Sequence, residues 1–198
     1  MIDIQWQPYT RVQLLQHLVD SNNYKTYLEI GCDKNQVFGS ISVEYKEGVD
    51  PKRGGTQRMT SDEFFAQDIR TWDLIFIDGL HTYEQVCADV DNALVRLNPG
   101  GSIVIHDMLP LTQEQAGPAP VERYWLGDVW RLAFDLSGRS DLNFHLFKFD
   151  FGCGIVTHGV QTPLKGKPDS TWKFYEKNYN RLPLITFEEY FKHAPIQS

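Results

Sequence analysis

Residues 73–107 constrain the fold of this chain more than any other stretch. Asp73–Asp78 is a nearly continuous apolar run that ends in an acid, which is typical of a strand buried on both faces of a parallel sheet. Residues 83–97 then carry apolar side chains at i, i+3, i+4 and i+7 spacing, which predicts an amphipathic helix. Ser102–Ile105 is a second buried strand. A strand, a crossover helix and another strand form a βαβ unit, whose crossover is right-handed in nearly all proteins.

The flanking segments continue this alternation. The two apolar runs near residue 150 are joined only by Asp150-Phe151-Gly152, and so short a connection makes them antiparallel. The pattern therefore predicts an α/β fold with a parallel sheet and a terminal antiparallel hairpin. We expect further helices at 9–20, 35–42 and 125–137, and strands at 26–30, 47–50, 143–149 and 153–158.

Length and composition limit the class of protein. The 198 residues fit one domain, because domains typically contain roughly 100–200 residues. We expect an N-terminal helix in 1–24, a core in 25–160 and a helical tail in 161–198. The net charge of −7 disfavours binding to nucleic acid, since such a surface repels a polyanion. Three cysteines do not suggest a disulfide framework. Neither a signal peptide nor a membrane-spanning run is visible, so we expect a cytoplasmic protein without a membrane partner.

Polar residues follow the predicted strands one after another. In open α/β sheets, ligands bind at the carboxyl ends of the strands, so these positions are the candidate site. Any one of them could be an ordinary loop residue or helix cap. Five such positions at one sheet edge favour a ligand site. The candidates are Glu29, Gly31, Asp50, Thr60, Ser61, Asp62, Asp78, His81, His106 and Asp107.

Three Ser/Thr-x-x-Glu/Gln patterns mark helix starts. Thr60 with Glu63, Thr82 with Gln85 and Thr186 with Glu189 all have capping-box spacing. We therefore expect helices to begin just after Thr60, Thr82 and Thr186.

Five motifs resemble those of class I S-adenosylmethionine-dependent methyltransferases. The branch most similar is the small group called methyltransferase family 24, which is similar to metal-dependent sugar O-methyltransferases. The likeness covers about residues 24–160 and is most specific from Asp78 to Asp107. It implies a Rossmann-like three-layer sandwich with a mostly parallel seven-stranded sheet and one antiparallel strand. The motifs lie at 27–31, 48–51, 60–65, 73–83 and 97–107.

The resemblance assigns cofactor contacts to the early strand ends. Gly31 lies where a backbone without a side chain can approach a ligand, and a following helix start would favour the methionyl carboxylate. Asp50 can accept hydrogen bonds from the two ribose hydroxyls. Ser61 and Asp62 fall where the family contacts adenine, although a helix cap is the alternative interpretation. The complete implied set is Glu29, Gly31, Asp50, Thr60, Ser61, Asp62 and Asp78.

Asp78, His81, His106 and Asp107 form the proposed chemical centre. Asp78 and Asp107 end adjacent strands, so their carboxylates could share a divalent cation that lowers the pKa of an acceptor hydroxyl. His81 could face the same cavity as the general base. The Asp-x-x-His spacing matches the metal ligand and base of sugar O-methyltransferases. His106 stands where those enzymes carry an acid, and it is predicted to complete the metal site with Asp78 and Asp107. An imidazole in that place leaves open Mg²⁺, Mn²⁺ or no metal.

The sequence therefore predicts an S-adenosylmethionine-dependent methyltransferase that methylates a hydroxyl of a small molecule, such as a sugar or glycosylated metabolite. Two alternatives stay open. A non-catalytic nucleotide-binding protein would fit the loss of glycines after Gly31, while an NAD-dependent oxidoreductase would require G-x-G-x-x-G there. Residues 108–124 should cover the acceptor pocket. The aromatic tail could pack on its own domain or on a second copy, which leaves a homo-oligomer open.

Overall fold

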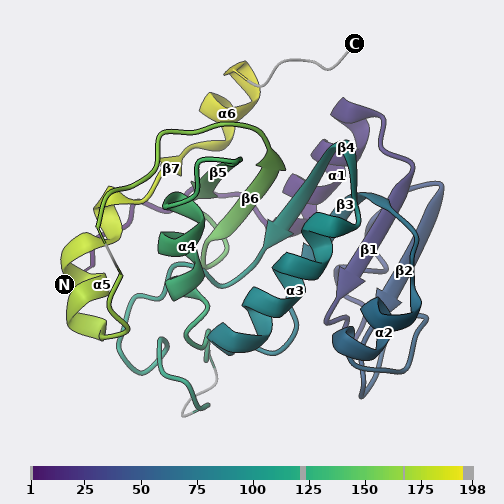
Figure 1. Cartoon of the computed structure of the whole chain (residues 1–198), viewed down its shortest axis with the longest axis horizontal. Coiled ribbons are helices and arrows are strands. Elements are labelled where there is room, and N and C mark those ends of the chain that lie inside the picture. The colour runs from purple at the N-terminus through teal and green to yellow at the C-terminus, as the bar shows by residue number, and fades with distance from the viewer. Residues whose placement is uncertain (1, 121–123, 167, 194–198) are drawn as a thin grey trace.

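A seven-stranded sheet lies between two layers of helices (Figure 1). The computed structural model describes residues 2–120, 124–166 and 168–193, and the side chains of these residues except that of His193. The strands are β1 (Thr26–Ile30), β2 (Tyr45–Val49), β3 (Trp72–Ile77), β4 (Leu97–Ile105), β5 (Leu142–Phe147), β6 (Cys153–His158) and β7 (Leu184–Ile185). The helices are α1 (Arg11–Asn22), α2 (Ser61–Gln67), α3 (Tyr83–Val95), α4 (Trp130–Ser137), α5 (Trp172–Asn178), the 3₁₀ turn η1 (Tyr179–Arg181) and α6 (Phe187–His193).

The strand order is β2-β1-β3-β4-β6-β5-β7. β6 runs antiparallel to both of its neighbours, β4 and β5, and every other neighbouring pair is parallel. The expectation of a mostly parallel seven-stranded sheet with one antiparallel strand is confirmed. The seventh strand, β7, comes from the tail and pairs with β5.

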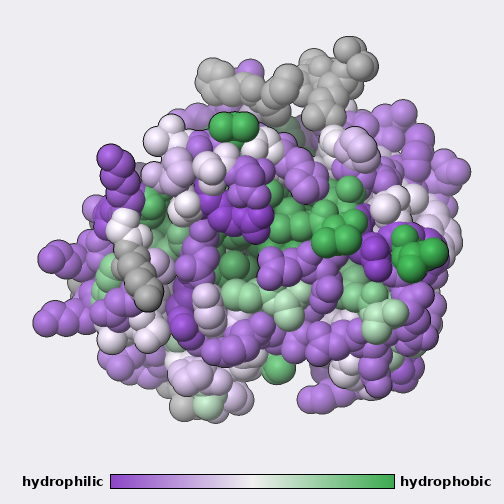
Figure 2. Space-filling view, in the orientation of Figure 1, coloured by the Kyte–Doolittle hydropathy of each residue, from purple (hydrophilic) through white to green (hydrophobic). Residues whose placement is uncertain are grey.

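Each face of the sheet buries its own apolar cluster. One cluster joins β-strand side chains such as Ile75 and Ile103 to α2, α3, α4 and α5. The other joins Leu74 and Phe76 to α1, to the turns after β1 and to α6. Successive side chains of a strand point to opposite faces, so the continuous apolar run of β3 supplies both clusters. On the α3 and α4 face, hydrophobic side chains show at the centre of the view among hydrophilic ones (Figure 2).

Strand register places the candidate residues in one row. Ile30 of β1 pairs with Val49 of β2 and with Ile77 of β3, and Ile77 pairs with Ile105 of β4. The residues that follow these four positions are Gly31, Asp50, Asp78 and His106. Four parallel strands therefore deliver their next residues to a single edge of the sheet.

Several local predictions differ from the structure. Residues 35–42 form turns and no helix, so no helix follows Gly31 directly. The residues before Thr60 form no strand beyond an isolated bridge between Val49 and Gln57, so Thr60 follows a loop. The helix predicted from residue 125 begins only at Trp130. Gly127, with φ +70°, holds the preceding backbone in a conformation that a helix does not adopt.

Two of the three predicted capping boxes are present. Thr60 with Glu63, and Thr186 with Glu189, exchange the reciprocal hydrogen bonds of this motif. Thr82 precedes α3, but its side chain makes no capping hydrogen bond. Asp128 caps the helix instead, because its Oδ1 accepts a 2.7 Å hydrogen bond from the backbone N–H of Tyr83. Within the described ranges, no helix has the length and apolar character needed to cross a bilayer.

Candidate active site

A cavity of about 540 Å³ runs along the sheet edge where β1, β2 and β3 end. Asp50, Thr60 and Ser61 lie along one part of its lining, while Asp78 and His81 lie along another. The cavity lining thus includes all of the predicted cofactor residues except Asp62, and Asp78 and His81 of the predicted chemical centre, while His106 and Asp107 are not part of it.

Asp78, His81 and Asp107 converge. His81 Nε2 lies 3.3 Å from Asp78 Oδ1, and His81 Nδ1 lies 3.2 Å from Asp107 Oδ2. One ligating atom from each of the three residues falls within 4.8 Å of the others. Gly127 packs so closely on His81 that a Cβ there would lie 1.7 Å from the His81 carbonyl oxygen. The loop after β4 therefore fixes the backbone of His81, and it does so through a residue that must be glycine.

His106 lies behind this group, buried and surrounded by carboxylates. Its Nδ1 is 3.0 Å from Asp107 Oδ1 and 3.4 Å from Asp78 Oδ1, while its Nε2 is 3.6 Å from Asp150 Oδ1. Nδ1 nevertheless lacks a hydrogen bond with good geometry in the described structure. The converging set that could hold a metal thus contains His81, while His106 as a ligand stays a prediction.

Arg11 reaches the same network from the start of α1. Its Nη1 donates to Asp150 Oδ1 at 2.9 Å and lies 3.3 Å from His106 Nε2. Its Nε is 3.7 Å from Asp78 Oδ2. The backbone around this network is strained, because Asp107, Asp150 and Phe151 all have positive φ. Such strain in non-glycine residues concentrates at functional sites.

The carboxylates and imidazoles of this network stabilise each other's charged forms. Burial opposes ionisation of Asp78, yet His106 and His81 hold the pKa of its carboxyl well below its usual range. Burial also opposes protonation of His106, but Asp78 and Asp107 raise its pKa well above the usual value. The pKa of His81 is raised in the same way, against burial, by Asp78 and Asp107. Despite burial, His106 and the backbone N–H of Arg11 lower the pKa of Asp150 to about 2.

Gly31 and Asp50 are fixed by backbone contacts. A Cβ on Gly31 would lie 2.1 Å from the Asp78 carbonyl oxygen, so only glycine allows β1 and β3 to end side by side. Asp50 accepts hydrogen bonds from three backbone N–H groups, those of Asp33, Lys52 and Arg53. A carboxylate has about four lone-pair sites, so Asp50 keeps acceptor capacity for one further donor and not for two.

Ser61 and Asp62 meet Gln85 of α3 beside the cavity. The Nε2 of Gln85 donates to Asp62 Oδ1 and Asp89 Oδ1 at 3.1 Å and lies 3.3 Å from Ser61 Oγ. Carboxylates accept only, so the amide nitrogen must face them and the Gln85 oxygen is turned the other way. Gln85 lines the cavity. The residue that sequence spacing assigns to a helix cap therefore belongs to the site.

Glu29 lies at the bottom of the cavity and is 1% exposed. The hydroxyl of Tyr27 donates a short hydrogen bond to its carboxylate. Burial raises the pKa of Glu29 to about 7. A ligand could therefore meet this group in either protonation state near neutral pH.

Arg11, Gln85 and Asp150 were missed as site residues. Arg11 lies in a predicted amphipathic helix, where an arginine reads as a solvated residue, and Asp150 lies in a tight turn, where an acid is common. Asp150 is 139 residues from Arg11 in sequence. The only sequence signal for Asp150 was the predicted hairpin whose turn contains it. A hairpin beside the last parallel strand places that turn at the same edge of the sheet.

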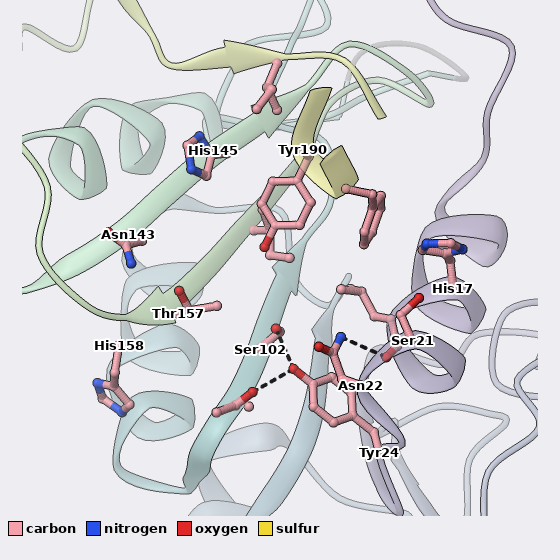
Figure 3. A pocket seen from close by; sticks show the side chains of 16 residues that line it. His17, Ser21, Asn22, Tyr24, Ser102, Asn143, His145, Thr157, His158 and Tyr190 are labelled. Carbon is pink, nitrogen blue, oxygen red and sulfur yellow. Dashed lines mark hydrogen bonds between the residues drawn. The ribbon is translucent and has the colours of Figure 1, made fainter. Parts of the chain in front are cut away.

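A second cavity, of about 680 Å³, lies between α1 and α6 at the opposite end of β4 (Figure 3). Its floor includes Ser102 and Tyr24, whose hydroxyl groups are hydrogen-bonded at 2.9 Å. Among the described residues that line it, none is an acid, a lysine or an arginine. The second cavity is the larger of the two and is lined by His17, His145 and His158, whereas the carboxylates that could bind a cation lie at the strand-end cavity.

The comparisons with known proteins agree on one family. The family model described as a methyltransferase domain matches residues 9–108, just over half of the 198 residues. No curated protein matches the chain.

Three solved structures illustrate the likeness of fold. An O-methyltransferase from Bacillus cereus, in complex with SAH, has a TM-score of 0.55 at 14% identity, over 80% of this chain and 84% of that one. The O-methyltransferase TomG from Streptomyces achromogenes, in complex with SAM, has a TM-score of 0.53 at 15% identity, over 75% and 79%. MycE from the mycinamycin biosynthetic pathway, in complex with Mg, SAH and mycinamycin VI, has a TM-score of 0.51 at 16% identity, over 75% of this chain and 49% of that one.

At these identities the solved structures establish the fold, and the family model adds the match in sequence. The likeness concerns the fold, which in this chain is a mixed seven-stranded sheet covered by helices. The chain belongs to the methyltransferase domain family, and its fold resembles that of the methyltransferase TomG in complex with SAM.

Proposed function

We propose that this methyltransferase transfers a methyl group from S-adenosylmethionine to a hydroxyl oxygen of a small molecule, such as a sugar or a glycosylated metabolite. One observation carries the proposal. The imidazole of His81, held between Asp78 and Asp107, lies along the same cavity as Asp50 and Ser61. The acceptor class takes its support from MycE, whose solved structure contains mycinamycin VI.

The residues along the cavity fit the cofactor in sections. Ser61, Asp62 and Gln85 surround the start of α2, where they can hold the adenine. Asp50 retains one acceptor position for a ribose hydroxyl after its three backbone hydrogen bonds. S-adenosylmethionine supplies an electrophilic methyl group next to the Asp78 and His81 end.

His81 is positioned to remove the acceptor proton. Its Nδ1 lies 3.2 Å from Asp107 Oδ2 and 3.3 Å from the carbonyl oxygen of Trp125, which favours the tautomer with hydrogen on Nδ1. Nε2 then carries the lone pair and lies 3.3 Å from Asp78 Oδ1, so it takes the acceptor proton when the acceptor hydroxyl binds between these two groups. After transfer, the charged imidazole lies between two carboxylates that stabilise it.

The same three side chains also fit a divalent cation. Two carboxylates and an imidazole suit Mn²⁺ better than Mg²⁺, which prefers oxygen ligands. A cation held by Asp78, His81 and Asp107 would lower the pKa of an acceptor hydroxyl. His81 cannot serve as ligand and base together, so the two arrangements predict different responses to a chelator.

Thermal unfolding and turnover test the proposal. S-adenosylhomocysteine should raise the melting temperature of the protein, while NAD should not. Turnover is followed as release of S-adenosylhomocysteine on a panel of monosaccharides, glycosides and catechols. His81→Ala should keep the stabilisation by S-adenosylhomocysteine and lose about 100-fold or more in turnover, in line with general base catalysis.

His158→Ala is the matched control, because that histidine lines the second cavity and does not line the cavity that holds His81. It should leave turnover unchanged. Absence of any shift with S-adenosylhomocysteine would overturn the cofactor assignment, and normal turnover of His81→Ala would overturn the base assignment. Activity that EDTA abolishes and Mn²⁺ restores identifies the cation arrangement, whereas activity that resists EDTA identifies His81 as the base.

A further inference from the structure

The loop after β1 lacks the helix N-terminus that could bind an anion in the site. Residues 33–40 form turns, so no helix N-terminus follows Gly31 to offer its N–H groups to an anion. S-adenosylmethionine ends in an amino acid whose carboxylate must be neutralised somewhere near the Asp78 end of the cavity. Asp78 itself is an acid, and Glu29 nearby is another. A cation at this end of the cavity would neutralise that carboxylate.

Arg11 offers one donor beside Asp78 that no hydrogen bond or ion pair occupies in the described structure. Its Nη1 is occupied by Asp150 and His106. Neither Nε nor Nη2 makes a hydrogen bond in the described part of the chain, and Nε is buried. Because Nε faces Asp78 Oδ2 at 3.7 Å and is closed to solvent, Nη2 is the donor that can offer a ligand carboxylate a charge-assisted hydrogen bond. Arg11 also lines the cavity.

Asp150 holds the guanidinium of Arg11 in place. It accepts a 2.8 Å hydrogen bond from the backbone N–H of Arg11 and a 2.9 Å hydrogen bond from Arg11 Nη1. Both ends of the residue are thus tied to one carboxylate. A side chain fixed in this way loses little freedom when it binds a ligand, which increases affinity.

Two other cations, Lys34 and Lys52, line the cavity. Both are exposed, and neither makes a side-chain hydrogen bond or ion pair in the described structure. Lys52 is close to Asp50, at the section of the cavity assigned to the ribose. Lys34 is nearer to Gly31 in sequence, which makes it the competing anchor and the natural control.

We propose that Arg11 is the anchor for the methionyl carboxylate of the cofactor, through its Nη2 atom. The inference rests on the proposed use of S-adenosylmethionine. It assigns to α1 the anion-binding role that the start of the helix after β1 would otherwise fill.

Isothermal titration calorimetry on the full chain with two ligands tests this anchor. S-adenosylhomocysteine carries the carboxylate, while 5′-methylthioadenosine keeps the adenosine and lacks the amino acid. Arg11→Met should weaken S-adenosylhomocysteine binding about 10- to 100-fold and leave 5′-methylthioadenosine binding within about twofold, as expected for loss of a charge-assisted pair. Arg11→Lys keeps the positive charge without the planar guanidinium, so it should lose less affinity for S-adenosylhomocysteine than Arg11→Met. Lys34→Met should change neither affinity.

The outcomes separate the two proposals. If the wild-type chain binds neither ligand, the proposed function fails and the anchor fails with it. If it binds both, the anchor alone is overturned by equal losses for the two ligands in Arg11→Met, by unchanged S-adenosylhomocysteine binding, or by the same selective loss in Lys34→Met. Should Arg11→Met fail to fold, Arg11→Lys decides: an unchanged ratio of the two affinities overturns the anchor.

Discussion

At the scale of single residues, two buried carboxyl groups on neighbouring strands differ in the sign of their pKa shift. Glu29 of β1 is buried, and burial raises its pKa to about 7. Glu47 of β2 is also buried in part, but hydrogen bonds from Tyr45, Gln57 and Arg70 outweigh burial and lower its pKa. The difference arises because Glu47 has charged and polar donors around it, while the hydrogen bond from Tyr27 does not offset the burial of Glu29.

Replacing each acid by its amide should therefore change stability in opposite directions. Glu29 has a folded-state pKa above its unfolded value of 4.5, so its contribution is fully present below pH 4.5 and is lost as pH rises through about 7. Glu29→Gln should raise the free energy of unfolding at pH 8 by on the order of 2 kcal/mol and leave it little changed at pH 4.5. Urea unfolding at the two pH values measures this.

Glu47→Gln is the matched control and should destabilise the protein at pH 8, since it removes a carboxylate that is favoured in the folded state. A Glu29→Gln variant that is less stable than wild type at pH 8 would contradict the account of its burial.

At the scale of elements, α3 depends on a residue outside its own sequence neighbourhood. Asp128 accepts from the backbone N–H of Tyr83 across 45 residues, and its other oxygen accepts from Arg131 Nη1 at 2.9 Å. Asp128 therefore ties the start of α3 to the start of α4. His81 lies just before this point, so the same contact helps to set its position.

Asp128→Ala should lower the free energy of unfolding by about 1–2 kcal/mol, the usual cost of a lost helix cap that leaves a buried N–H unpaired. Thr82→Ala should cost only a few tenths of a kcal/mol, because that side chain makes no capping hydrogen bond. Urea unfolding of the two variants measures the difference. Equal costs would show that the local capping box forms in solution after all.

At the scale of the whole molecule, α6 packs against α1 and the segment before it on one face of the sheet. The ring of Phe187 in α6 stacks on Tyr9 at 4.5 Å and lies edge-on to His17 of α1 at 5.1 Å. Glu188 accepts hydrogen bonds from Tyr9 and from Gln7 Nε2. The tail thus closes the apolar cluster that α1 begins, and it also adds β7 to the sheet.

Phe187→Ala should lower the free energy of unfolding by about 2 kcal/mol, below the 3–5 kcal/mol usual for a fully buried ring because Phe187 is only partly buried. Glu188→Gln should cost less than Phe187→Ala, because the hydrogen bonds of Glu188 are exposed. Thermal or urea unfolding measures both. A loss for Phe187→Ala no larger than that for Glu188→Gln would mean that the tail does not stabilise the sheet face.

The strands and the row of site residues were predictable because both depend on local sequence and on one general property of parallel sheets. The apolar run before Asp78 matches β3, and the carboxyl ends of parallel strands share an edge, which brings Asp50, Asp78 and Asp107 to one region. The boxes at Thr60 and Thr186 were also predictable, because each forms within four consecutive residues.

Contacts between distant segments were not predictable in this way. The sequence by itself determined the alternation of strands and helices, and with it the edge at which the acids gather. Only the tertiary structure decided that Arg11 and Asp150 join that edge and that Asp128 caps α3. It also decided that backbone N–H groups occupy most of the acceptor positions of the Asp50 carboxylate. Periodicity reports which face of an element is buried, whereas the partner of a polar side chain depends on how loops with positive φ bring remote segments together.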